Sequence, residues 1–329
     1  MKKLICSLLA LILALSLCAC GSSNAGSSAA GGSSAAEEKT FVVGICQLAQ
    51  HVALDAATKG FRDALEQALP GRVKFEEKNA SGESTNCATI INGFVSENVD
   101  LIMANATPAL TAAASATSTI PILGTSVTAY GVALDIPNFN GTVGGNISGT
   151  SDLADLKAQA EMLKEWFPEA KKVGLLFCSA EANSRYQVDE VKKALEALGV
   201  SCTEFAFTDT NDLAAVTQNA ADNSDVVYIP TDNTAANNVE SIANILLPAG
   251  VPAVCGEEGI CAGCGVCTLS ISYYDLGFTT GQMAAKILTG EANISTMAIE
   301  YAPAAKKFNA AFCEQLGLTV PEGYQEIAK

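Results

Sequence analysis

Short apolar runs alternate with longer amphipathic segments along most of the chain. Six of these runs are rich in Val, Ile or Leu and are bounded by turn residues: 40–46, 100–106, 120–126, 171–178, 224–230 and 250–256. Continuous apolar runs of this length are typical of strands that are buried on both faces, as in a parallel sheet covered by helices. The runs therefore predict parallel strands.

The segments between the runs carry apolar residues at helical spacing. Three such stripes are Leu153/Leu156/Ala160/Leu163/Phe167, Val188/Val191/Leu195/Leu198 and Leu276/Thr280/Met283/Ile287. Ser184 and Gln187 have the spacing of a capping box at a helix start, and Gly290 predicts a helix end. The repeated strand–helix–strand order predicts an α/β fold with right-handed crossovers.

The alternation stops once, in the middle of the chain. Residues 127–152 have no helical period and are rich in Gly, Asn and Thr, and the strand–helix order starts again after them. About 290 residues from Phe41 onward suit two domains of ordinary size. We therefore expect two similar α/β lobes with a ligand cleft between them.

The first forty residues predict export. Met1-Lys2-Lys3 is followed by a mainly apolar run of 14 residues, LICSLLALILALSL, which suits a signal peptide better than a membrane span. The run ends in LCAC, which resembles a bacterial lipobox with Cys20 as the lipid-modified residue. The Gly/Ser/Ala-rich stretch that follows predicts a flexible tether. A plain secretory signal is the alternative.

Charge and motif content exclude several classes of function. The chain has 19 basic and 35 acidic residues, and loss of Lys2 and Lys3 with the signal peptide takes the net charge from −16 to about −18. Without a basic patch, nucleic-acid binding is not expected. The single histidine and the lack of G-x-S-x-G, P-loop and H-E-x-x-H motifs argue against an enzyme. The glycines at 141–145 are expected in a hinge.

Polar residues follow the predicted strands, where open parallel sheets bind ligands. Several of them immediately precede helices, whose free N–H groups favour a carboxylate. Hydroxyl and N–H groups together with a carboxylate are what a zwitterion needs. Each residue taken alone is also an ordinary capping or turn residue. The strand ends carry Gln47, His51, Thr107, Thr125, Ser126, Glu181, Ser184, Asp232, Asn233, Glu257 and Glu258.

The chain resembles the substrate-binding lipoproteins of ABC transporters, specifically those associated with tryptophan and tyrosine uptake. The resemblance lies in VGICQLAQHVALDAATKGF, PILGTSVTAYGVALDIPNFNGTVGGNISGTSD, FCSAEANS, IPTDNTAANNVESIA and GEEGICAGCGVCTLSISYYDLGFTTGQMAAKILTG. It implies a type I periplasmic-binding-protein fold, with two Rossmann-like lobes of parallel sheets joined by three crossovers. The implied lobes are 41–147 with 258–292 and 148–257 with 293–329, after a signal peptide at 1–19 and a tether at 20–40.

The resemblance also implies a role in capture without catalysis or a cofactor. The protein would bind a small zwitterion, such as an aromatic amino acid, as a lipid-anchored monomer outside the cytoplasm and deliver it to an ABC permease and its ATPase. A sensor that reports to a receptor is the alternative. The implied ligand-binding residues are Gln47, His51, Thr107, Thr125, Ser126, Ser151, Asp152, Glu181, Ser184, Asp232 and Asn233.

Roles within that set are expected to divide between the two ends of the ligand. Thr125 and Ser126 would take the carboxylate, and Asp232, Glu181 or Asp152 would take the ammonium, with the choice among the three acids left open. His51 is either a helix-start cap or a wall of the pocket.

Three cysteines, Cys261, Cys264 and Cys267, follow a C-x₂-C-x₂-C spacing. A [4Fe–4S] cluster needs a fourth thiolate, and a zinc site would lack a nearby histidine. A disulfide within the trio or with Cys255 is possible in an oxidising compartment. The leading interpretation is free buried cysteine acting as a small hydrophobic residue, with no metal.

Overall fold

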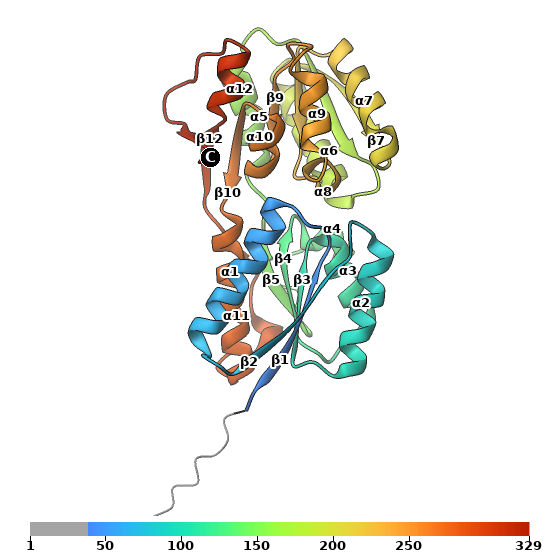
Figure 1. Cartoon of the computed structure of the whole chain (residues 1–329), viewed down its shortest axis with the longest axis vertical. Helices are drawn as coiled ribbons and strands as arrows, with labels where there is room; N and C mark the ends of the chain where they lie inside the picture. Colours follow the sequence, from blue (N-terminus) through green and yellow to red (C-terminus); the bar gives the residue numbers. More distant parts are fainter. Residues whose placement is uncertain (1–38, 329) are drawn as a thin grey trace, which may run out of the picture. The chain divides into compact units, whose positions relative to one another are not determined.

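A computed structural model describes residues 39–328 (Figure 1). Residues from Lys39 onward form one compact unit. The predicted signal peptide, Cys20 and the tether up to residue 38 lie outside the described residues. In the described part of the chain, no helix combines the length and the apolar character needed to cross a membrane.

The described strands form two sheets. Sheet A has the order β11-β5-β4-β3-β1-β2 and defines lobe 1. Its strands are β1 (Phe41–Gln47), β2 (Val73–Asn79), β3 (Leu101–Asn105), β4 (Ile122–Val127), β5 (Ile147–Ser151) and β11 (Glu300–Tyr301). All neighbours in this sheet pair in parallel.

Sheet B defines lobe 2 and has the order β13-β12-β10-β9-β8-β6-β7. Its strands are β6 (Lys172–Cys178), β7 (Ser201–Phe207), β8 (Val226–Ile229), β9 (Ala253–Cys255), β10 (Cys267–Ile271), β12 (Ala304–Phe308) and β13 (Gln325–Glu326). Only the pairing of β10 with β12 is antiparallel.

Helices connect successive strands in both lobes. Lobe 1 contains α1 (Val52–Ala68), α2 (Ser84–Glu97), α3 (Thr107–Ala116), α4 (Tyr130–Ala133), α11 (Tyr273–Thr289) and the 3₁₀ turn η1 (Ile294–Thr296). Lobe 2 contains α5 (Leu156–Trp166), α6 (Ala182–Ala197), α7 (Thr210–Asn223), α8 (Asn233–Ala236), α9 (Val239–Leu246), α10 (Glu258–Cys264) and α12 (Ala310–Gln315).

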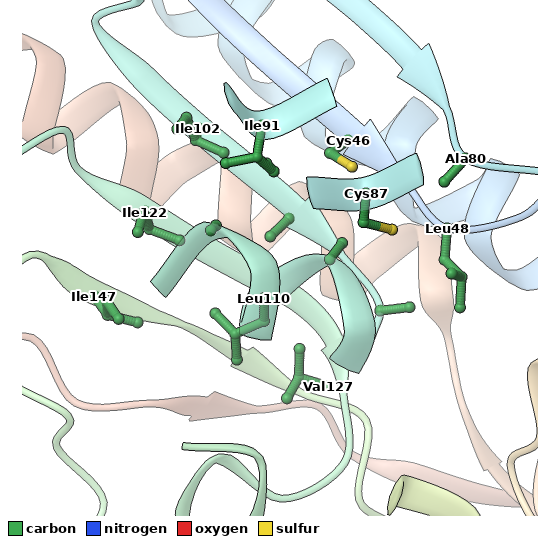
Figure 2. Close-up of a cluster of buried hydrophobic side chains, with 14 of the residues drawn as sticks. Cys46, Leu48, Ala80, Cys87, Ile91, Ile102, Leu110, Ile122, Val127 and Ile147 are labelled. Atoms are coloured by element: carbon green, nitrogen blue, oxygen red, sulfur yellow. The ribbon is translucent and has the colours of Figure 1, made fainter. Parts of the chain in front are cut away.

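Both faces of each sheet are buried. In β3, Leu101 and Met103 contribute to the apolar cluster under α1 and α11, whereas Ile102 and Ala104 contribute to the cluster under α2 and α3. Figure 2 shows the second of these clusters, in which Ile102 lies among side chains from α2 and neighbouring strands. Successive strand residues point to opposite faces, so a strand covered on both sides must be apolar throughout.

Glycines bring α1 and α11 into direct backbone contact, and the two helices run side by side in Figure 1. A Cβ atom added to Gly277 would lie 1.9 Å from the carbonyl oxygen of Ala57, and one added to Gly60 would lie 2.1 Å from the carbonyl oxygen of Tyr274. Both helices begin beside the cavity described below. Their close packing therefore sets the relative positions of His51 and Tyr273, at the two helix starts.

The expected α/β fold with parallel-dominated sheets is confirmed. All six apolar runs form strands, and the three apolar stripes fall on α5, α6 and α11, except that Leu153 precedes α5 and that Phe167 and Leu198 are the C-caps of α5 and α6. Gly290 ends α11 with φ +80°, the left-handed conformation that favours glycine. The chain passes between the sheets three times, after β5, after β10 and after β11. Each lobe is therefore assembled from two separate stretches of chain.

The expected lobe boundaries are corrected by the strand pairing. β5 pairs with β4 in sheet A, so residues 148–151 belong to lobe 1. β10 pairs with β9 and β12 in sheet B, so residues 258–271 belong to lobe 2. β11 pairs with β5 in sheet A, so residues 293–301 belong to lobe 1 and not to lobe 2. The sequence interpretation did not identify Cys267–Ile271 as a strand, although that strand carries the chain through lobe 2 before α11 begins.

Two local predictions are also corrected. Helix α6 begins at Ala182 with Glu181 at its N-cap, so Ser184 lies inside the helix and forms no capping box. Gln187 instead donates to the carbonyl oxygens of Asn183 and Thr231. The glycines at 141–145 lie in a loop between α4 and β5 within lobe 1 and not in a hinge, because both flanking elements belong to that lobe.

Candidate functional site

A narrow cavity lies among strand ends and helix starts of the two lobes. Its free volume is about 10 Å³, roughly the space of one water molecule. The two lobes must therefore part before a small molecule can enter. The lining residues are His51, Ala53, Leu54, Ser126, Thr128, Asp152, Asn183, Thr231, Asp232, Asn233, Ala236, Glu257 and Tyr273.

Asp152 is the acid in this cavity with a free oxygen atom. It follows β5, where the chain leaves sheet A, and is 5% exposed. The hydroxyl of Tyr273 donates to Asp152 Oδ2 at 2.9 Å, while Oδ1 is buried without a partner. Burial raises the pKa of Asp152, and the hydrogen bond from Tyr273 and the nearby Thr128 side chain oppose that rise. An unpaired buried acceptor is costly, so Oδ1 calls for a donor.

Asn183 supplies a second free acceptor from lobe 2. Its Nδ2 donates to Glu181 Oε2 at 3.1 Å and to the carbonyl oxygen of Thr231 at 3.1 Å. These bonds leave Oδ1 buried with no partner. Two oxygen acceptors, Asp152 Oδ1 and Asn183 Oδ1, therefore line the same cavity without donors.

Ser126 supplies a free hydroxyl from lobe 1. The pairing of β4 with β5 shifts register between Gly124 and Val127, and Ser126 takes a left-handed φ of +54° at that irregularity. A bulge of this kind redirects a side chain at a strand end. The Ser126 Oγ is buried without a partner.

The start of α1 lines the same cavity as that hydroxyl. Ala53 and Leu54 line the cavity in the first turn, and no side chain caps the helix at His51. First-turn N–H groups have no partner within a helix and favour an anion. His51 Nε2 lies 3.3 Å from Asn233 Oδ1 and joins the two lobes, while burial lowers the pKa of the imidazole. His51 thus occupies the N-cap position of α1 without capping it through its side chain, and it also lines the cavity.

Two further acids line the cavity but are occupied as helix caps. Asp232 accepts from the backbone N–H groups of Cys178 at 2.7 Å and Ala235 at 2.8 Å. Glu257 caps α10 by accepting from the N–H groups of Gly259 at 2.6 Å and Ile260. Burial raises the pKa of both carboxyls, that of Glu257 to about 7. Both are held by backbone N–H groups, whereas Asp152 has a free atom.

Six of the eleven residues predicted from the sequence do not line the cavity. They are Gln47, Thr107, Thr125, Ser151, Glu181 and Ser184.

Three of the four lobe 1 members of that group form hydrogen bonds within their own lobe. Gln47 donates to Asp55 and accepts from Thr58. The hydroxyl of Thr125 bonds that of Thr150 at 3.2 Å, and the hydroxyl of Ser151 donates to the carbonyl oxygen of Thr128. Thr107 begins α3 and lines a neighbouring groove that also includes Asn183 of lobe 2.

The carboxylate of Glu181 is occupied by hydrogen bonds within lobe 2, and a role for Glu181 in ligand binding stays a prediction. Its Oε2 accepts from the Asn233 N–H at 3.0 Å and from the side chains of Asn183 and Asn233. Its Oε1 accepts from the N–H and the hydroxyl of Thr234, both at 2.8 Å. The carboxylate therefore secures the turn between β8 and α8. Ser184, its helix neighbour, is completely buried.

The site set predicted from the sequence omitted several lining residues. Thr128, Asn183, Thr231, Glu257 and Tyr273 all line the cavity. Glu257 follows a predicted strand, which is a signal that could have included it. Tyr273 lies at the start of a predicted helix, but nothing in the local sequence shows that its hydroxyl meets Asp152, 121 residues earlier in the chain.

The cysteine trio is divided between the two faces of sheet B. Cys261 and Cys264 lie on α10 in the same apolar cluster as Cys255, whereas Cys267 lies in the other cluster with Cys313. All three members of the trio are buried. Among residues 39–328, no group of three His, Cys, Asp or Glu side chains could hold a metal ion. The trio therefore packs as part of the core.

The buried acids predict how stability depends on pH. Asp152, Asp232 and Glu257 have raised pKa values in the folded state, so folding favours their protonated forms. For Glu257 this contribution is complete below the unfolded value of 4.5 and is lost as the pH rises through about 7. We expect the melting temperature of the ligand-free protein to fall between pH 5 and pH 7.5, as measured by circular dichroism.

The control is Glu257→Gln, which cannot ionise but keeps an oxygen for capping. General repulsion among acidic surface groups also lowers stability with rising pH, and it acts on both proteins equally. The variant should therefore show a shallower fall than the wild type. Equal slopes would contradict the role assigned to Glu257.

Comparisons with known proteins agree with this architecture. The profile of a family described as "ABC transporter substrate binding protein" matches residues 42–329. A tyrosine-binding protein of Clostridioides difficile (strain R20291) is 30% identical over 294 residues, which cover 88% of this chain and 85% of that protein.

Two solved structures are similar over most of the chain. An ABC domain from Streptococcus pneumonia in complex with L-Trp has a TM-score of 0.83 at 28% identity and covers 88% of this chain and 100% of that one. A ligand-free, open substrate binding protein from Clostridium difficile has a TM-score of 0.68 at 32% identity and covers 88% and 99%. The chain as a whole is thus more similar in structure to the tryptophan complex than to the open protein, despite similar identities.

Proposed function

The chain belongs to the family of ABC transporter substrate-binding proteins, and from this premise we propose that it captures an amino acid between its two lobes. The type I periplasmic-binding-protein fold suits this role, because two lobes joined by crossovers can close on a small molecule. The family is a binding family, so the cavity needs to hold and release a ligand and has no reaction to perform.

The observation that carries the proposal is the set of unpartnered polar atoms in the cavity. Asp152 Oδ1 and Asn183 Oδ1 are acceptors and suit an ammonium group, which has three donors and no acceptor. Ser126 Oγ and the first-turn N–H groups of α1 are donors and suit a carboxylate. An amino acid carries both groups on one carbon and would satisfy both sets at once.

An aromatic amino acid is the ligand that the relatives support. One relative at 30% identity is a tyrosine-binding protein, and one similar structure holds L-Trp. In this chain, Leu54, Ala53 and Ala236 add apolar surface to the cavity, and Tyr273 contributes a ring. Aromatic side chains gain most from such surfaces, since they bury large areas.

The location follows from the family and from the N-terminal sequence. Substrate-binding proteins of this type work outside the cytoplasm and supply a membrane permease with its ATPase. For this chain, anchoring through a lipid on Cys20 is supported by the lipobox-like LCAC alone. A monomer suits the role, because one two-lobed chain forms a whole cavity.

The test is a thermal-shift screen of the compact unit that begins at Lys39 against the twenty amino acids, with nucleosides and sugars as controls. A ligand present at about 100 times its dissociation constant adds about 2.7 kcal/mol to the free energy of unfolding. We expect a rise in melting temperature with tyrosine, tryptophan or phenylalanine. A rise with a sugar or nucleoside alone would contradict the proposal.

A further inference from the structure

Charge is distributed unevenly around the cavity. Three lining residues, Asp152, Asp232 and Glu257, are buried carboxylic acids, whereas neither lysine nor arginine is among the described lining residues. His51 is the one lining residue that could become a cation, and its burial opposes protonation. The walls therefore offer negative or neutral groups to a ligand from both lobes.

The part of the cavity that would bind the ligand ammonium group contains two buried oxygen acceptors. Asp152 Oδ1 lies at the crossover after β5, Asn183 Oδ1 lies on α6 of lobe 2, and both are buried without partners. The second oxygen of Asp152 is held by Tyr273 at 2.9 Å, which fixes the direction of the carboxyl group. A ligand without an ammonium group would leave both acceptors without a hydrogen bond, and leaving a buried acceptor unpaired costs free energy.

The part of the cavity that would bind the ligand carboxylate offers weaker interactions than the part that would bind the ammonium group. It consists of one hydroxyl, on Ser126, and the uncapped start of α1, without a charged partner. A carboxylate there also lies in a cavity that contains three acids. If the ligand lacks a carboxylate, a water molecule can bond to the hydroxyl and to the N–H groups of Ala53 and Leu54. Loss of the carboxylate therefore removes less binding free energy than loss of the ammonium.

We propose that this cavity selects its ligand by the ammonium group, so that the primary amine left when an amino acid loses its carboxylate is a second class of ligand. The inference rests on the proposed function, since it assigns the amino-acid site a broader substrate class. It extends capture to aromatic amines, which carry a net positive charge and suit a cavity lined by acids.

The experiment is isothermal titration calorimetry of the wild-type protein at pH 7.5 with two matched series. The first is L-tyrosine, tyramine and 3-(4-hydroxyphenyl)propionate, and the second is L-tryptophan, tryptamine and indole-3-propionate. Within the series whose amino acid binds, the amine should bind within about tenfold of the amino acid, whereas the ammonium-free acid should bind at least about 100-fold more weakly.

The unfavourable outcomes of this experiment distinguish the inference from the proposed function. An amino acid that binds while its amine binds more than about 100-fold more weakly would overturn this inference and leave the proposed function intact. No binding of any of the six compounds would overturn both the inference and the aromatic amino acid as ligand. Tight binding of the ammonium-free acid would reverse the assignment of the two ends.

Ser126→Ala provides a second readout that a merely structural role would not produce. Alanine keeps a Cβ atom at the left-handed position, so backbone strain there is unchanged and only the hydroxyl is lost. The affinity for the amino acid should fall more than the affinity for the amine. An equal fall for both ligands would place the carboxylate elsewhere and contradict the inference.

Discussion

Replacing Asp152 with asparagine is expected to lower the affinity for the amino-acid ligand at least about 100-fold, or about 2.7 kcal/mol. The substitution keeps the shape of the side chain and its contact with Tyr273 but removes the charge that faces the ammonium group. Removing one partner of a buried, hydrogen-bonded charge pair typically costs 2–5 kcal/mol of binding free energy, so about 2.7 kcal/mol is a modest expectation. Isothermal titration calorimetry at pH 7.5 measures the change.

Asp155→Asn is the matched control. Asp155 lies three residues further along, is exposed and caps α5 by accepting from the Ala158 N–H at 3.0 Å. Asparagine caps helices as well as aspartate does, so this variant makes the same charge change outside the cavity. Its affinity should match the wild type. If Asp152→Asn also binds within about threefold of wild type, Asp152 is not the ammonium partner.

Replacing Gly277 with alanine is expected to destabilise the fold by about 3 kcal/mol or more. The added Cβ atom would lie 1.9 Å from the carbonyl oxygen of Ala57, a contact that α1 and α11 can relieve only by moving apart. Overpacking usually costs about 1–3 kcal/mol, and here the obstacle is rigid backbone, so the cost should reach the upper end. Urea denaturation of the ligand-free protein gives the free energy of unfolding.

Gly93→Ala is the control for the helical position. Gly93 lies inside α2, and an added Cβ atom meets nothing within 4 Å. Alanine favours helix over glycine by up to about 1 kcal/mol, so this variant should be at least as stable as the wild type. If Gly277→Ala unfolded at the same urea concentration as Gly93→Ala, the close contact between α1 and α11 would be disproved.

The sequence interpretation was most accurate where local pattern and burial agree. Each of the six apolar runs formed a strand, because a strand covered on both faces must be apolar along its length. The interpretation failed at β10 and at the lobe boundaries. β10 carries Thr268 and Ser270 among apolar residues, and strand pairing, not composition, assigns it to sheet B.

The candidate site was predicted in part. His51, Ser126, Asp152, Asp232 and Asn233 do line the cavity, because strand ends and helix starts of parallel sheets converge there. Glu181 also follows a strand and precedes a helix, but its carboxylate accepts five hydrogen bonds from Asn183, Asn233 and Thr234. Sequence position alone could not separate it from Asp152.

The sequence by itself determined the class of fold, the acidic character of the chain and the kinds of polar group at the strand ends. Only the tertiary structure decided which of those groups are free to bind a ligand. The reason is that hydrogen bonds are satisfied by neighbours in space. The backbone N–H of Asn233 bonds to the carboxylate of Glu181, 52 residues earlier in the chain. The hydroxyl of Tyr273 bonds to one carboxylate oxygen of Asp152, 121 residues earlier, and the other oxygen of Asp152 has no partner.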